Sequence, residues 1–251
     1  MLSAFFHAAI YDPLYNGLVF LVGVVPGNDI GLAVILLTII VRIIIYPLSK
    51  RAILSQLAMK KIAPEVEELK KKYKNNSAEQ GAAIFALYRE RDIHPFASFG
   101  LLLVQFPILI GLYFVFLNKT FPGVDPTLLY PFIEAPSHIN MQFLGLLDMS
   151  AHHNIPLAIL VALSQLVYSR LSMGPREKIL DSTPVEATLS GDMAKSFDLQ
   201  ARYVFPLIFG VISYSVAAAA PLYWLTSNLF MIGQELAMGK RFTTQLRSER
   251  A

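Results

Sequence analysis

Two polar residues, Thr38 and Arg42, interrupt an apolar run from Ile30 to Leu48. The other seventeen of its nineteen residues are apolar, with Tyr46 and Pro47 counted among them. A run of this length is about what an α-helix needs to cross a bilayer. A guanidinium inside such a helix costs roughly 2.5–3.5 kcal/mol on insertion scales. Thr38 and Arg42 are spaced i, i+4, so the sequence predicts that they share one helix face.

Two explanations of Arg42 are open from the residues alone. It lies about six residues, or ~9 Å, from the end of the run, and a long side chain can cover much of that distance by snorkelling to the interface. Alternatively, Arg42 faces a water-filled cavity inside a helix bundle. The cavity explanation needs further polar groups on the other helices.

Uncharged polar and aromatic residues do occur in the other apolar runs. Each could simply bond a neighbouring helix, or in the case of Trp224 serve as an interfacial aromatic. Together they could line a hydrated groove in which Arg42 is the only charge. The candidate groove residues are Arg42, Thr38, Gln105, Gln165, Ser213, Tyr214, Trp224 and Asn228.

The composition indicates a polytopic membrane protein. Of 251 residues, 55% are hydrophobic and only 16% are charged, and the mean hydropathy is +0.51. A soluble domain of this size rarely combines these values. The absence of cysteine excludes disulfides, thiolate metal sites and cysteine nucleophiles. The first basic residue is Arg42, so we expect the first long helix to act as its own insertion signal.

The expected fold is an all-α membrane protein with five transmembrane helices and a cytoplasmic helical hairpin. The N-terminal segment 1–28 is expected to be an interfacial amphipathic piece, broken at Asp12-Pro13 and Pro26-Gly27. The first spanning helix is 29–48, the hairpin is 49–95, and a basic tail is 239–251. The remaining spans are expected at 96–117, 155–172, 202–219 and 221–238, the last two joined by a tight turn.

Within the hairpin, local signals predict where its two helices begin. Pro64 followed by Glu65 is typical of a first helical turn. Ser77-x-x-Gln80 is a capping-box pattern and predicts the start of the second helix at Ser77. Apolar stripes on both helices favour a hairpin that packs on itself and is polar outside.

Basic residues predict the topology. Segment 49–95 contains ten Lys or Arg, among them Lys60 and Lys61, whereas segment 118–154 contains one. By the positive-inside rule, 49–95 is cytoplasmic. Five crossings then place the N-terminus outside and the C-terminus in the cytoplasm, together with the charged loop 173–200.

Enzymatic and metal chemistry find little support in the sequence. No nucleophile–base arrangement and no phosphate-binding glycine loop is present. His152-His153 near Asp148 are interpreted as polar loop residues rather than metal ligands. The basic run 60–74 could bind anionic lipid or nucleic acid, but its interleaved acids favour a solvated helix face. We therefore predict no enzyme activity, cofactor, metal or specific nucleic-acid site.

Three segments resemble YidC-type membrane protein insertases (the YidC/Oxa/Alb family) in its short form, without a large extracytoplasmic domain. Residues 31–73, containing MKKIAPE, resemble the first core helix and hairpin. Residues 105–116 and 221–235 (QFPILIGLYFVF and PLYWLTSNLFMIGQE) resemble the second and fifth helices. Where the family usually has Asn-Pro and a further proline, this chain has His94-Pro95 and Phe99-Gly100.

The resemblance implies a groove open to the cytoplasm and to lipid, with Arg42 as its charge and Thr38, Gln165 and Trp224 near lining positions. It implies that the hairpin recruits and guides substrates. The implied partners are nascent membrane proteins and lipids at the bacterial plasma membrane, with a Sec translocon and a ribosome as further candidates. A small-solute transporter or channel is the alternative, but it would normally show inverted repeats, and none is visible.

Overall fold

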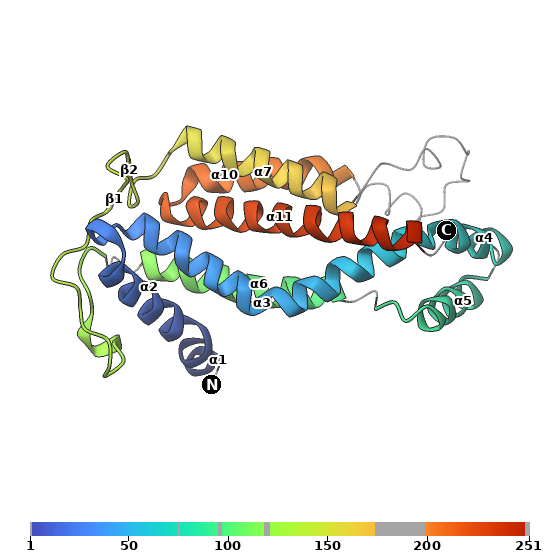
Figure 1. Cartoon of the computed structure of the whole chain (residues 1–251), viewed down its shortest axis with the longest axis horizontal. Coiled ribbons are helices and arrows are strands. Elements are labelled where there is room, and N and C mark those ends of the chain that lie inside the picture. Colours follow the sequence, from blue (N-terminus) through green and yellow to red (C-terminus); the bar gives the residue numbers. More distant parts are fainter. Residues whose placement is uncertain (1, 75, 95–96, 118–120, 174–198, 249–251) are drawn as a thin grey trace. The chain divides into compact units, whose positions relative to one another are not determined.

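The computed structural model describes residues 2–74, 76–94, 97–117, 121–173 and 199–248. They are helical except for loops and one short β-hairpin (Figure 1). Two compact units result. The first comprises 1–43 and 106–234, and the second comprises 44–105 and 235–251. The expected all-α class is confirmed. Most of the expected loop 173–200 lies outside the described residues.

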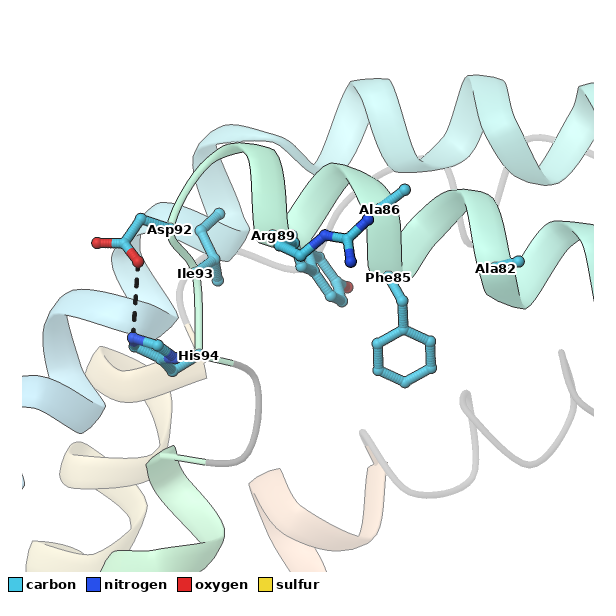
Figure 2. Close-up of a pocket in the computed structure, with 8 residues that line it drawn as sticks. Ala82, Phe85, Ala86, Arg89, Asp92, Ile93 and His94 are labelled. Carbon is cyan, nitrogen blue, oxygen red and sulfur yellow. Dashed lines mark ion pairs between the residues drawn. The ribbon is translucent and has the colours of Figure 1, made fainter.

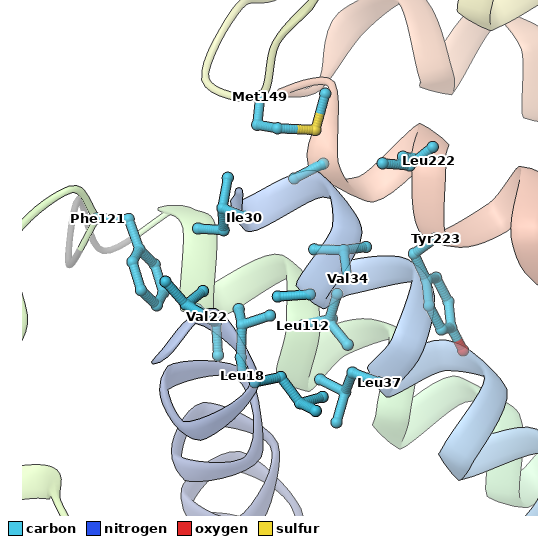
Figure 3. Close-up of a cluster of buried hydrophobic side chains, with 14 of the residues drawn as sticks. Leu18, Val22, Ile30, Val34, Leu37, Leu112, Phe121, Met149, Leu222 and Tyr223 are labelled. Carbon is cyan, nitrogen blue, oxygen red and sulfur yellow. The ribbon is translucent and has the colours of Figure 1, made fainter. Parts of the chain in front are cut away.

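The first unit contains most of the core. Its helices, in chain order, are α1 (Leu2–Phe6), α2 (Asp12–Val24), the first part of α3 (Ile30–Lys61), most of α6 (Ala97–Leu117), α7 (Ile155–Met173), α10 (Phe205–Ser215) and the first part of α11 (Ala219–Ser248). Leu18 and Val22 of α2 pack with Val34 of α3, Leu112 of α6 and Tyr223 of α11 (Figure 3). Each of these side chains is almost fully buried.

The break expected at Asp12-Pro13 is wrong. A π-turn, His7–Tyr11, joins α1 to α2, and the Asp12 N–H donates to the His7 carbonyl five residues earlier. The same arrangement precedes α10, where the π-turn Gln200–Val204 is followed by Phe205 and Pro206. Proline has no backbone N–H to donate to the preceding turn. The wider π-turn before it changes the local hydrogen-bond pattern, so the missing donor does not end the helix. The break at Pro26-Gly27 is confirmed, with Gly27 at φ 70°.

Helix α3 is much longer than expected. It continues past residue 48 to Lys61, with Pro47 inside it. The Ser49 hydroxyl donates to the Tyr46 carbonyl beside the proline, and the residues that follow are mostly good helix formers. The apolar run ends at Leu48, but the helix does not end there. Likewise, α11 runs to Ser248, so part of the expected tail 239–251 is helical.

Helix α10 ends at Ser215, four residues before the expected boundary, because the loop between α6 and α7 binds the chain that follows α10. Val216 is extended. Ala218 N donates to Ala151 O (2.9 Å), and Ala219 N donates to Met149 O (3.1 Å). These loop–backbone bonds replace helical ones and make the expected tight turn between α10 and α11.

The loop between α6 and α7 carries the β-hairpin, β1 (Gln142–Phe143) and β2 (Leu147–Asp148), paired antiparallel. It also carries a 3₁₀ turn, Pro126–Leu128. At that turn, hydrogen bonds from the Thr127 hydroxyl and N–H lower the pKa of Asp125. Asp148 accepts hydrogen bonds from the N–H and the hydroxyl of Ser150, and the described residues contain no cluster of three metal-ligating side chains.

The second unit contains the predicted helical hairpin, α4 (Ala63–Lys72) and α5 (Ser77–Glu90). Pro64 and Glu65 lie in the first turn of α4, as expected. Helix α5 begins at Ser77 as predicted, but the prediction that Ser77 and Gln80 form a capping box is wrong. The N-cap of α5 is Asn76, whose side chain accepts from Glu79 N, and Gln80 donates instead to Lys70 O (3.0 Å).

Asn76→Ala is predicted to weaken the first turn of α5 by about 1 kcal/mol, because one helix N–H loses its acceptor. Amide hydrogen exchange of residues 77–80 in the full chain should speed up about fivefold. Ser77→Ala is the matched control and should leave these rates unchanged. Faster exchange in Ser77→Ala but not in Asn76→Ala would instead support Ser77 as the N-cap.

Gly31→Ala is predicted to destabilise the first unit by about 1–3 kcal/mol through overpacking. A Cβ at this position would lie 2.6 Å from Cβ and Cγ of Phe143, so the β-hairpin would have to move. The measurement is thermal unfolding in detergent. Gly23→Ala, which meets nothing within 4 Å, should be neutral or slightly stabilising. Equal unfolding temperatures for the two variants would contradict the close packing of Phe143.

Candidate functional site

Arg42 is buried in the first unit. Its side chain is 4% exposed, although the α3 residues around it are almost all apolar. Tyr223 of α11 and Tyr168 of α7 are near enough to interact with it electrostatically, and Figure 3 shows Tyr223 between α11 and α3. A charge at this position is therefore buried and within electrostatic range of two phenol groups, each with an oxygen that can accept a hydrogen bond.

Thr38 lies one turn before Arg42 and is 1% exposed. Its hydroxyl donates to the Val34 carbonyl of the same helix (2.6 Å). The donor is thus used within α3, and only the oxygen lone pairs remain available to a neighbour.

A polar contact joins α7 to α11. The Asn228 side-chain amide donates to the Ser164 hydroxyl (3.0 Å), and that hydroxyl donates to the Val161 carbonyl (2.9 Å). Both side chains are buried. This contact fixes the relative rotation of the two helices that also carry the two tyrosines near Arg42.

Two further buried hydroxyls have no hydrogen-bond partner among the described residues. They are those of Ser213 on α10 and Ser227 on α11, which are 1% and 2% exposed. An unsatisfied buried hydroxyl costs roughly 1–3 kcal/mol. Such groups are usually satisfied by water or by a ligand.

The other candidates lie in different surroundings. Gln165 is half-buried on α7, and Trp224 is half-buried with its ring edge-to-face against Phe209 (5.4 Å between centroids). Tyr214 is exposed beside the loop between α6 and α7, where its carbonyl accepts from His153 N and its ring contacts the His153 ring. Gln105 belongs to the second unit. The structure thus buries Arg42, Thr38, Ser213 and Asn228, but not these other four.

The hairpin contains a second candidate surface. Arg91 Nη2 pairs with Glu65 Oε2 at 2.8 Å and ties the end of α5 to the start of α4. A cavity of about 470 Å³ lies along the C-terminal half of α5 (Figure 2). Its walls combine apolar side chains such as Phe85 with the charged groups of Arg89 and Asp92. Lys60 and Lys61 lie at the end of α3, just before this unit's helical pair.

Comparison with known proteins identifies the family. Residues 21–245 match the family model described as 60Kd inner membrane protein. The chain is 34% identical over 215 residues to the membrane protein insertase YidC of Clostridium tetani, which covers 86% of this chain and 84% of that protein. It is 28% identical over 234 residues to YidC of Fusobacterium nucleatum, covering 92% and 98%.

The chain belongs to the YidC family of membrane protein insertases. A crystal structure of an active YidC insertase, with its first transmembrane domain resolved, superposes with a TM-score of 0.52 at 26% identity. That alignment covers 89% of this chain and 45% of the solved one. The protein is thus a bacterial inner-membrane insertase, and a small-solute transporter is not favoured.

In the insertase, two helices are long and apolar enough to cross a membrane within the described residues, α3 and α7, and Leu103–Phe116 of α6 is a shorter apolar stretch. The expected count of five crossings therefore stays a prediction. The domain boundaries and the groove residues also remain predictions, although the family resemblance itself is confirmed.

The residues predicted from the sequence did not include Tyr168 and Tyr223, the two tyrosines that act electrostatically on Arg42. Both lie in apolar runs in which other polar residues were predicted to line the groove. Ser227 lies beside the candidate Asn228, and a polar side chain in an apolar run is the signal for it.

The Asn228–Ser164 bond is predicted to couple α7 and α11 by about 0.6 kcal/mol, a typical value for polar pairs between membrane helices. A double-mutant cycle with Asn228→Ala, Ser164→Ala and the double variant measures this coupling through unfolding in detergent. Ser215→Ala is a matched control, because its hydroxyl bonds only its own helix (Val211 O, 3.1 Å). Strict additivity of the two single variants would contradict the bond.

Proposed function

We propose that the insertase takes the polar extracytoplasmic segment of a nascent membrane protein into a hydrophilic groove beside Arg42. The observation that carries this proposal is a buried guanidinium on which Tyr168 of α7 and Tyr223 of α11 act electrostatically. The hydroxyls of Ser213 and Ser227, unsatisfied among the described residues, support it, since water or a polar substrate segment would satisfy them. Snorkelling is less favoured, because Arg42 is 4% exposed.

Arg42 acts in this proposal by attracting an acidic residue of the substrate. A charge pair is stronger in surroundings of low dielectric constant than in water. A hydrated groove also shortens the apolar distance that the polar segment must cross. The apolar helix of the substrate then moves sideways into lipid, a transfer favoured by roughly 25 cal/mol per Å² of apolar surface removed from water. No covalent bond changes in this process.

The proposed topology follows from the charge asymmetry. Segment 49–95, with ten basic residues, lies in the cytoplasm, and segment 118–154, with one, lies outside. The N-terminus is then outside and the C-terminus inside. The hairpin α4–α5 receives substrates on the cytoplasmic side, where a ribosome and a Sec translocon are further proposed partners.

Arg42→Ala and Arg42→Glu are predicted to reduce insertion of a small membrane protein with an acidic extracytoplasmic segment by about tenfold or more, equivalent to about 1.4 kcal/mol. Arg42→Lys should retain much of the activity, because a point charge suffices. The measurement is insertion in cells depleted of their own insertase, complemented by each variant at equal expression.

Arg51→Ala is the matched control, since Arg51 lies on the same helix but is exposed. A substrate whose acidic residue is changed to lysine should be inserted poorly by the wild type and better by Arg42→Glu. If Arg42→Ala and Arg42→Glu both insert the acidic substrate as well as the wild type does, the electrostatic role is wrong.

A further inference from the structure

The two most exposed large apolar side chains among the described residues lie in the loop between α6 and α7. They are Leu146, 87% exposed, and Phe132, 80% exposed. Apolar residues on a membrane-spanning helix are exposed to lipid as a matter of course. These two residues instead project from loop backbone outside the helices, so their exposure needs another reason.

Leu146 belongs to a turn that is unfavourable for its sequence. Leu146 N donates to Phe143 O at 2.9 Å, and the central residues Leu144 and Gly145 have φ values of 51° and 71°. Such turns strongly prefer Asn, Asp or Gly at the first central position. Here the position holds leucine, 60% exposed. Neither its backbone conformation nor its exposure would favour leucine in water.

The turn is held firmly despite this. Asp29 Oδ2 accepts from Leu144 N (2.7 Å), while Asp29 Oδ1 accepts from Gly31 N (2.8 Å) at the start of α3. Asn140 pairs through its backbone with both Asn28 and Ile30. Asp29 is 4% exposed. We call this set the Asp29 clamp. It fastens the turn to the first residues of α3.

A second clamp holds the loop that carries Phe132. Asn16 of α2, 1% exposed, donates to Leu128 O (2.8 Å) and accepts from Tyr130 N (2.7 Å). The Tyr130 ring in turn contacts the ring of Phe132, with the centroids 5.6 Å apart. We call this set the Asn16 clamp. Each buried polar clamp thus positions one of the two most exposed apolar side chains.

We propose that Leu144, Leu146 and Phe132 are interfacial anchors that insert into the outer lipid leaflet and fix the outer ends of the helices at the bilayer surface. This inference rests on the proposed topology. The spanning helix α3 begins at Ile30, so a turn fastened to that residue lies near the membrane boundary. Segment 139–147, which includes Leu144 and Leu146, contains no Asp, Glu, Lys or Arg, and such apolar loop tips are stabilised at a lipid interface.

Lipid is the favoured occupant because the loop is attached to both helices that pass the length and hydropathy test for spanning. The Asp29 clamp fastens the turn to the start of α3. The loop leads into α7, whose first residue, Ile155, is 58% exposed, and Ile159 is 53% exposed. The anchors therefore lie on a loop held between the ends of two candidate membrane spans.

The test uses the absence of cysteine in the chain. Leu146→Cys, Phe132→Cys and, as the matched control, Ser137→Cys are made singly in the full-length protein and labelled with a small environment-sensitive dye. Ser137 is an exposed polar residue of the same loop. Each protein is placed in nanodiscs of phosphatidylethanolamine and phosphatidylglycerol that hold one copy, with and without lipid carrying an acyl-chain nitroxide.

The dye at 146 and at 132 should be quenched by the nitroxide lipid about threefold more strongly than the dye at 137. Equal quenching at all three positions would overturn the proposal. Blue-shifted emission without lipid quenching would also overturn it, because the apolar contact would then be with protein. The readout needs no substrate and no defined leaflet, so its failure is distinct from loss of insertion in Arg42 variants.

The clamps predict a crossed pattern. Asp29→Ala should reduce quenching at 146 and leave 132 unchanged, whereas Asn16→Ala should do the reverse. Both clamp residues are buried, so folding of each variant is checked by the emission of Trp224, the only tryptophan. If either variant loses quenching at both positions, the assignment of one clamp to one anchor is wrong. The lipid contact itself is tested separately, by quenching at 146 and 132 in the protein with both clamps intact.

Discussion

A guanidinium enclosed by apolar helices needs polar partners, and this requirement organises the first unit. Arg42 is buried on α3, so α7 and α11 must present groups that tolerate a charge, and they do so with Tyr168 and Tyr223. The Asn228–Ser164 bond sets the rotation of those two helices. A helix bundle packed only by apolar contact would have no reason to prefer that rotation, since lipid is as apolar as leucine.

The same cost of unsatisfied polar groups explains how the loop between α6 and α7 is held. Asp29 and Asn16 are buried, and each satisfies backbone groups of this distant loop. The Asp29 carboxylate accepts three N–H groups, which compensate for its burial. The loop is therefore fastened by polar side chains of α2 and of the residue before α3, whereas the interior of the unit is filled by apolar ones such as Leu18 and Val34.

The sequence was sufficient for features that depend on composition. The apolar runs predicted α6 and α7 nearly to the residue, and the Pro64-Glu65 pair predicted the start of α4. Hydropathy did not predict the end of α3, because the helix continues past the apolar run, beyond Leu48 to Lys61. Proline was misread at Asp12-Pro13, because a single π-turn, invisible in a propensity argument, accommodates the missing donor.

Side-chain roles proved harder to predict than elements, because a role depends on which groups meet across helices. Ser77 and Asn76 are both good caps, and only the turn geometry selects Asn76. Tyr214 and Ser213 are adjacent in sequence, yet a rotation of about 100° along the helix exposes Tyr214 beside the loop between α6 and α7 and buries Ser213. The helical period could have predicted which of the two is buried only if the burial of another α10 residue had already been known. The family resemblance supplied such a reference for α3 and α11, and it was weakest for α7, where Tyr168 was missed.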